Sequence, residues 1–312
     1  MILRNLKRRS TRGQGRPKQL PPEAAIIAGW VMTALLAVCG PAAGAESLDL
    51  GVSGYGISLG NSRSFNGLRI NAVDDHVQRV NGINLTLWRA KDNDGAEMNG
   101  LLVGLVGPDG GDVNGVAAGL VGVGAAERLR GAAIGGVGVG APHVTGIAVG
   151  GIGLGATERL LGIGIGGIGV GAGERLQGLA FGGLAVGAGS DLQGVAFGGL
   201  AVGAGRRLQG IAIGGAAVGA GQHLEGLGVT PGMIGATRIT GAALSGLYLR
   251  SKRVTGLATG AYCRVTGRMA GLSIGLLNDA GILNGLQLGV VNIARNNPKG
   301  LQVLPLLNFH VE

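Results

Sequence analysis

The chain has 312 residues, of which 68 are glycine and only 3% are aromatic, and it carries a formal net charge of +9. Glycine does not recur at every third position and there are only nine prolines, which excludes a collagen triple helix. Seven of the basic residues precede residue 46, so residues 46–312 hold 19 basic and 16 acidic side chains. This small excess, with no basic patch interleaved with aromatic residues, argues against nucleic-acid binding.

The first 45 residues contain the three parts of a secretory signal peptide in order. Residues 1–19 are basic, Ala24 to Cys39 is an apolar run, and an Ala-Gly-Ala motif precedes Glu46. This order predicts export with cleavage after residue 45, and the run is short for a membrane span, which needs about 20 apolar residues. Lipidation at Cys39 is the alternative. Cleavage leaves Cys263 as a single cysteine, which we interpret as a small buried apolar residue.

From residue 67 onward the sequence repeats every 15 or 16 residues, with steps of 18 and 14 once each. Each repeat begins at a glycine that follows an apolar residue and one further residue, and Gly51 is a weaker first start. Such a period indicates stacked structural repeats. The boundary glycines are Gly67, Gly82, Gly100, Gly115, Gly131, Gly146, Gly162, Gly178, Gly194, Gly210, Gly226, Gly241, Gly256, Gly271, Gly285 and Gly300.

Within a repeat, apolar residues are the first and third after the boundary glycine, as at Leu179 and Phe181. This period of two predicts a short strand, whereas a helix is disfavoured because glycine costs about 1 kcal/mol at each helical position. We expect Gly182-Gly183 to form a corner that shifts the phase, so that Leu184 and Val186 join the same interior.

The predicted interior therefore contains the large side chains. Phe181 and Phe197 are expected to form a buried ladder with Ile165 and Ile213. The predicted outer surface would be a flat face of small residues, suited to contact with a second solenoid, a membrane plane or a polysaccharide. Its rows would include Ala180, Gly182, Ala185, Ala196 and Ala212.

Short strands that cannot bury themselves alone are stable when they stack, so the sequence predicts an all-β solenoid of about seventeen turns. The alternative is a transmembrane β-barrel with one strand per repeat, although so few aromatic residues cannot form the girdles of such a barrel. We expect four parts: the signal peptide (1–45), more polar N-terminal repeats (46–114), a Gly/Ala-rich core (115–270) and C-terminal repeats (271–312).

The last repeats read GLSIGLLNDAGILN, GLQLGVVNIARNNPK and GLQVLPLLNFHVE. Residues 271–312 resemble the C-terminal repeats of bacterial glycine-rich surface-repeat proteins, an exported family with GLQIGLVN-type units. The resemblance implies a surface or outer-membrane location and no established catalytic residue.

Two functional motifs occur in the sequence as by-products of the repeat. Gly271 to Gly275 fits the nucleophile elbow G-x-S-x-G, but Ser273 occupies a position where other repeats carry Ala or Gln, and only Asp279 and His310 follow as partners. Gly164 to Gly169 fits the dinucleotide motif G-x-G-x-x-G, which several other repeats also match. Neither indicates an active site.

Clusters of acidic residues and histidine are equally sparse. The run Asp74-Asp75-His76 and the loop of Asp92, Asp94 and Glu97 could hold a cation, but we interpret both as solvated turns because neither has a complete ligand spacing. Thr145, Thr240 and Thr255 share one repeat position, as the threonines of a flat ice-binding face do, but the Gln, Leu and Glu that other repeats carry there argue against such a face.

Polysaccharide-cleaving solenoids need acidic residues clustered on one face. Here Glu127, Glu158 and Glu174 are each followed by arginine, which is typical of solvated ladder rungs rather than an acid–base pair.

The sequence therefore predicts an exported, non-enzymatic structural or adhesive element of the cell surface or envelope. We predict no catalytic residue, cofactor, metal ligand or small-molecule substrate, and self-association or an envelope surface as partner. Anchoring or transport by an outer-membrane barrel is the first alternative, and a polysaccharide-acting solenoid enzyme is the second.

Overall fold

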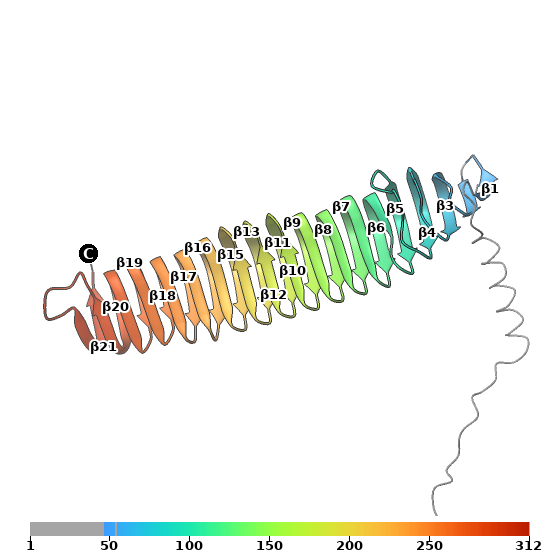
Figure 1. Cartoon of the computed structure of the whole chain (residues 1–312). Coiled ribbons are helices and arrows are strands. Elements are labelled where there is room, and N and C mark those ends of the chain that lie inside the picture. Colours follow the sequence, from blue (N-terminus) through green and yellow to red (C-terminus); the bar gives the residue numbers. More distant parts are fainter. Residues whose placement is uncertain (1–46, 54, 312) are drawn as a thin grey trace, which may run out of the picture. The chain divides into compact units, whose positions relative to one another are not determined.

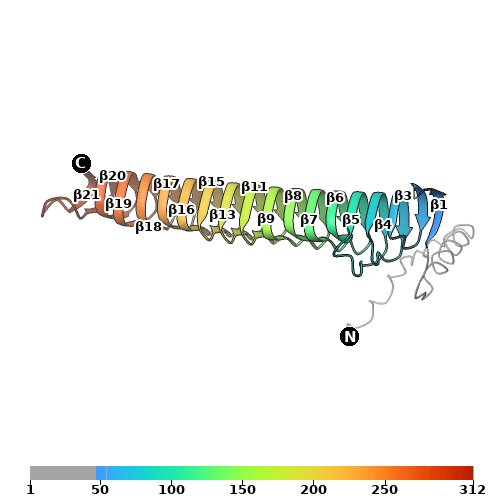
Figure 2. The same cartoon turned by 90° about the horizontal axis from the view of Figure 1, so that it is seen from above.

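The computed structural model describes residues 47–53 and 55–311. The strands in these residues wind into a β-solenoid of about 14 turns with repeats of about 16 residues. The turns stack along one axis, from β1 to β21 (Figures 1 and 2). At roughly 4.8 Å per turn the stack is about 65 Å long. The predicted solenoid is confirmed. The expected signal peptide and Cys39 lie outside the described residues.

The solenoid contains 21 described strands. They are β1 (Leu48–Val52), β2 (Tyr55–Leu59), β3 (Ser64–Asn71), β4 (Arg79–Thr86), β5 (Glu97–Gly104), β6 (Asp109–Gly119), β7 (Gly122–Gly135), β8 (Gly138–Gly150), β9 (Gly153–Gly166), β10 (Gly169–Ala172), β11 (Arg175–Gly182), β12 (Ala185–Ala188), β13 (Asp191–Gly198), β14 (Ala201–Ala204), β15 (Arg207–Gly214), β16 (Ala217–Thr230), β17 (Met233–Ser245), β18 (Tyr248–Thr259), β19 (Tyr262–Ile274), β20 (Leu277–Ala294) and β21 (Val303–His310).

A central turn consists of one long and one short strand. The long strand β11 pairs in parallel with β9 and β13, and the short strand β12 pairs in parallel with β10 and β14. Each residue therefore lies beside its counterpart in the next repeat, so that Phe181 is flanked by Ile165 and Phe197. Parallel pairing between neighbouring repeats also shows that the alternative with one antiparallel strand per repeat is wrong.

The core of the solenoid is made of small and medium-sized side chains. In the turn that begins at Gly194, the buried residues include Ala196, Val202 and Ala204, and Leu192 precedes that glycine in the same interior. The residue two places before each boundary glycine is buried throughout, from Phe65 to Leu283. In the central turns from Leu176 to Val218 the interior holds one leucine and one valine per turn, and alanine or glycine fills the other inward positions.

The predicted distribution of inside and outside is wrong for the long strand. Phe181 and Phe197 are 41% and 45% exposed, whereas Ala180, Ala196 and Ala212 are fully buried. The ladder of Phe181 and Phe197 with their neighbours Ile165 and Ile213 exists, but on the outer face. The alternation continues without interruption from the charged residue before the boundary glycine, and this phase places both apolar residues outside.

The expected phase shift at the diglycine is also wrong. Val186 is buried, but Leu184 stands at the corner between β11 and β12 and is exposed. Gly182 is buried, while Ala185 does lie on the outside, as expected.

Glycine is required where successive turns approach most closely. The boundary glycines have φ values near +120°, as at Gly194 (φ +119°), a conformation that side chains disfavour. A Cβ atom at Gly194 would lie 2.1 Å from the carbonyl oxygen of Gly178 in the preceding turn. At the diglycine corner, a Cβ at Gly199 would lie 1.9 Å from the carbonyl oxygen of Gly183.

Both ends of the described solenoid differ from its middle. The hairpin of β1 and β2 and the pairing of β20 with β21 are antiparallel, so each closes the stack with a reversed strand. The interior contains buried polar side chains near both ends, whereas the interior of the middle turns is apolar. Buried polar residues near the N-terminal end include Arg69, Asn71, Asp74, Asn84 and Thr86, and those near the C-terminal end include Ser273, Asn278, Gln287, Asn292 and Asn308.

Candidate functional site: an apolar face bordered by an arginine row

The outer face of the long strands has a polar half and an apolar half. Along β11 the outward side chains are Arg175, Gln177, Leu179 and Phe181, in this order, and the residues between them are Leu176, glycine or small residues. Because neighbouring turns pair in register, each of these four positions becomes a row that runs along the solenoid. A charged row and an amide row therefore lie beside two apolar rows on one face.

The apolar rows are formed by the first and third residues after each boundary glycine. They extend from Ile57 near the N-terminal end to Leu288 near the C-terminal end, interrupted by few polar residues. About half of these side chains are exposed and the others are half-buried, and nearly all of those from β16 onward belong to the half-buried group. The most exposed members are Ile57, Ile70, Ile83, Leu101, Val103, Val116, Ile134, Ile147, Ile165, Leu179, Phe181, Phe197, Ile211, Ile213 and Ile274.

The arginine row is the row three residues before each boundary glycine. Its ion pairs link neighbouring turns: the Nε and Nη2 atoms of Arg128 donate to the Asp112 carboxylate at 2.8 and 3.0 Å, which raises the pKa of Arg128. Arg207 donates to Asp191, a carboxylate whose side chain is only 2% exposed, at 3.3 Å. From β7 to β19 the row reads Arg128, His143, Arg159, Arg175, Asp191, Arg207, His223, Arg238, Arg253 and Arg268.

The amide row lies between the arginine row and the apolar rows. Near the N-terminal end it is an asparagine ladder, in which Asn81 donates to Asn66, Asn99 to Asn81 and Asn114 to Asn99 at 2.6–2.9 Å. Thr145, Thr240 and Thr255 belong to this row, so the shared position predicted for them is observed, although the last two alone are adjacent.

The three glutamates at the turn edge behave as ladder rungs. Glu174 lies 3.8 Å from Arg159 of the preceding turn, Glu158 lies 3.3 Å from His143, and Glu127 lies 3.5 Å from Arg128. All are exposed, and each has a basic neighbour, as the sequence pattern predicted.

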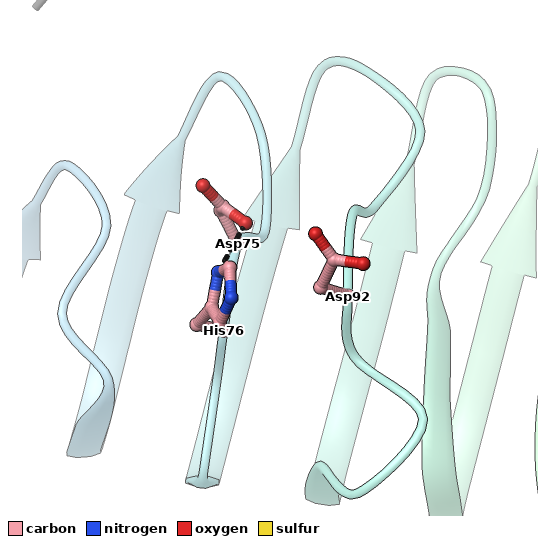
Figure 3. A group of neighbouring side chains, drawn as sticks. All are labelled: Asp75, His76 and Asp92. Carbon is pink, nitrogen blue, oxygen red and sulfur yellow. Dashed lines mark hydrogen bonds and ion pairs between the residues drawn. The ribbon is translucent and has the colours of Figure 1, made fainter. Parts of the chain in front are cut away.

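Some residues of the two acidic segments, Asp74-Asp75-His76 and Asp92 to Glu97, lie close together in the structure. Asp75, His76 and Asp92 come from neighbouring turns, and their potential ligand atoms lie within 4.8 Å of one another (Figure 3). The Nδ1 atom of His76 already lies 2.7 Å from an Asp75 carboxylate oxygen, and His76 and Asp92 are exposed. Asp94 and Glu97 do not join this group; Glu97 instead pairs with Arg79, which contributes to its lowered pKa, after the larger effect of a hydrogen bond from Asn99.

Asp74 does not join this group and instead stabilises the interior of the N-terminal turns. Its carboxylate is fully buried, forms an ion pair with the guanidinium of Arg69, and accepts hydrogen bonds from Asn71, Asn84 and Thr86. This network fills the interior of the N-terminal turns and leaves the carboxylate no free face for a cation.

The residues of the apparent nucleophile elbow are not brought together. Ser273 is buried and donates a hydrogen bond to Asn278 at 2.7 Å, Asp279 pairs with Arg295 at the edge, and His310 contacts Asn297. The segment from Gly164 to Gly169 covers the end of β9, a corner and the first residue of β10, and no helix follows it.

Among the described residues, none forms a helix with the length and hydropathy to cross a bilayer. Comparison of the chain with protein-family models, with curated proteins and with solved structures gives no match. The candidate functional site is therefore defined by the geometry of the outer face alone.

Proposed function

We propose that this chain is an exported, non-enzymatic repeat protein whose solenoid serves as a structural and adhesive element of a bacterial cell envelope. The observation that carries the proposal is the two apolar rows on the outer face, in which many large side chains are exposed, above all between Ile57 and Ile213. Two rows about 7 Å apart along about 65 Å give an apolar strip on the order of 500 Å². The largest apolar patch on a typical soluble monomer has about this size and is often a binding surface.

The construction of the face supports binding rather than chemistry. Rows of aliphatic and aromatic side chains on a rigid sheet offer a preordered surface, so little conformational entropy is lost on contact. The resemblance of residues 271–312 to bacterial surface-repeat proteins and the secretory pattern of residues 1–45 support the location.

The test is cell fractionation with variants of the apolar rows. Serine at three adjacent positions of one row should release the protein from the envelope pellet into the soluble fraction. The substitutions remove three large apolar side chains from the contact between the solenoid and the envelope. The matched control places serine in the outward row of the opposite sheet, where we expect no release. The apolar-row variant is F181S/F197S/I213S, and the control is A185S/A201S/A217S.

A parent protein that is soluble before any substitution, or equal release of both variants, would contradict the proposal. Mass spectrometry of the exported protein should find Glu46 as the first residue. Acylation at Cys39 would instead establish lipid anchoring.

A further inference from the structure

The two ends of the described solenoid differ in how their last strand is protected. At the C-terminal end, the loop between β20 and β21 extends past β21 (Figure 1). The Nδ2 atom of Asn297 in this loop donates to the carbonyl oxygen of Phe309 at 3.3 Å and to the Oδ1 atom of Asn308 at 2.8 Å. Pro305, which has no N–H group, lies in the same strand. A covering loop and a proline both hinder an edge strand from pairing with another chain.

The strand at the N-terminal end has neither form of protection. β1 pairs with β2 on one side, and no other strand of the described residues pairs with it. All five residues of β1 are exposed, and none of them is proline or lysine. In an antiparallel pair, every second residue directs its N–H and C=O groups away from the partner strand. β1 therefore presents backbone donors and acceptors on its other side, where a further strand can add to the sheet.

The outer face of the β1–β2 hairpin is apolar. It carries six exposed apolar side chains, three from each strand, and Val52 is the most exposed of them at 80%. The inner face differs, because Asp49 points the other way and its carboxylate accepts a hydrogen bond from the Oγ atom of Ser58 at 2.7 Å. The six apolar residues are Leu48, Leu50 and Val52 of β1 and Tyr55, Ile57 and Leu59 of β2.

A second copy of β1 matches this strand in one register. A strand that pairs with its own copy about a twofold axis runs antiparallel to it. When Leu50 lies opposite Leu50 of the second copy, Leu48 lies opposite Val52, so every pair on the outer face is apolar. Asp49 then lies opposite Gly51. A shift of two residues would instead place the two Asp49 carboxylates opposite each other or leave Leu48 without an apolar partner.

Two other occupants fit the edge of β1 less well. Cleavage after residue 45 leaves only Glu46 and Ser47 before β1, which are too few to form a further strand from the same chain. The β21 strand of another copy is covered by its own loop. A second β1 satisfies the backbone groups and the apolar side chains together, and twofold dimers are the commonest oligomers.

We propose that two copies of the exported chain join head to head through their β1 strands; this rests on the proposed function, in which residues 1–45 are removed on export. A twofold axis perpendicular to the joined sheet keeps the apolar rows of both copies on one side. The dimer then presents an apolar face of about 130 Å, twice the length of a single stack. Contact by one half holds the other half near the same surface, so the dimer binds an envelope more tightly than one copy does. The interface is smaller than most stable ones, so dimerisation should depend on concentration.

The test is sedimentation velocity of the exported protein, extracted with a nonionic detergent, over a range of concentrations. The parent should form a dimer whose share rises with concentration. L50K should raise the dissociation constant about tenfold or more, because two lysines would lie about 5 Å apart across the axis and the apolar pair is lost. L50E should weaken the dimer in the same way, and an equal mixture of L50K and L50E should restore it as a heterodimer. The control L306K places the same charge at an exposed leucine of the other end and should dimerise like the parent.

Circular dichroism melting verifies that the variants fold, as expected for an exposed position. A parent that stays monomeric while attached to the envelope would overturn this inference and leave the proposed function standing. Dimerisation of L50K like the parent, or a mixture of L50K and L50E that stays monomeric, would overturn the pairing through β1. F181S/F197S/I213S should dimerise like the parent, and loss of its dimer would overturn the inference in favour of contact through the apolar rows. A parent that dimerises through Leu50 but is absent from the envelope pellet would support this inference and contradict the proposed adhesive role.

Discussion

Replacing Leu192 by alanine should destabilise the solenoid more than replacing Phe197 by alanine, which reverses the usual order of these two residue types. Leu192 is fully buried, and truncation of a buried leucine costs about 2–5 kcal/mol because a cavity remains. Phe197 is 45% exposed and flanked only by Phe181 and Ile213 on its own row. A fully buried phenylalanine is worth at most about 3 kcal/mol of transfer free energy, so about half of it, roughly 1.5 kcal/mol, is at stake.

Urea denaturation followed by circular dichroism measures the difference as a shift in midpoint. Because a repeat array need not unfold in one step, amide hydrogen exchange of β11, β13 and β15 should accompany it. We expect faster exchange in these strands for Leu192→Ala and near-parent exchange for Phe197→Ala. A larger loss of stability for Phe197→Ala would refute the assignment of the two faces.

Three further substitutions, one of them with a matched control, test the interior. Gly194→Ala should lower the melting temperature sharply, because positive φ costs roughly 1–2 kcal/mol and the new Cβ would lie 2.1 Å from a carbonyl oxygen, whereas Gly187→Ala meets no atom within 4 Å and should melt like the parent. Burial raises the pKa of the Cys263 thiol to about 11, so the folded protein holds this proton more tightly than the unfolded chain does. Stability should therefore be complete below pH 9 and fall by about 1.4 kcal/mol per pH unit as the pH rises from 9 towards 11, a component that urea titrations of Cys263→Ala should lack. Asp74→Asn should cost about 3–5 kcal/mol, since it leaves the guanidinium of Arg69 buried without a counterion, and a midpoint unchanged in urea would disprove that role.

The repeat period and the strand-and-turn content could be predicted from the sequence because glycine and apolar residues recur at fixed spacing. The sequence predicts about seventeen turns and the structure has about 14, because the repeats at the two ends include antiparallel closing strands. The polar composition of the end segments is visible in the sequence, but the burial of their polar residues in the interior is not.

The predicted inside and outside of the long strand are wrong because the prediction follows the hydrophobicity of Leu179 and Phe181 and not the phase of the strand. The charged side chain of Arg175 must face water, and a strict period of two from this residue places Leu179 and Phe181 on the same outer face. The uninterrupted burial of the residue two places before the boundary glycine, such as Leu176, is the matching signal from inside. Alanine is the core residue at the next inward position, where Ala180, Ala196 and Ala212 are fully buried.

The sequence predicts which residues lie beside one another in the arginine row only when the exact length of each repeat is known. The pairing of Arg238 with Arg253 depends on a repeat of 15 residues in this part of the chain, and the meeting of Asp75 with Asp92 depends on loops that the period does not define. The buried ion pair of Asp74 gave no periodic signal, because it occurs in one turn.

The most direct measurement of the working face is the depth of single fluorescent labels on phospholipid vesicles. Cysteine placed at Phe197 or at Ala185, in a chain with Cys39 and Cys263 replaced by alanine, puts the label on the apolar rows or on the opposite sheet. With vesicles present, we expect the label at 197 to become protected from the aqueous quencher acrylamide, because the apolar rows enter the headgroup boundary, while the label at 185 stays as accessible as in buffer. Equal accessibility of the two labels, or protection of residue 185 alone, would contradict the conclusion that the apolar face is the binding surface.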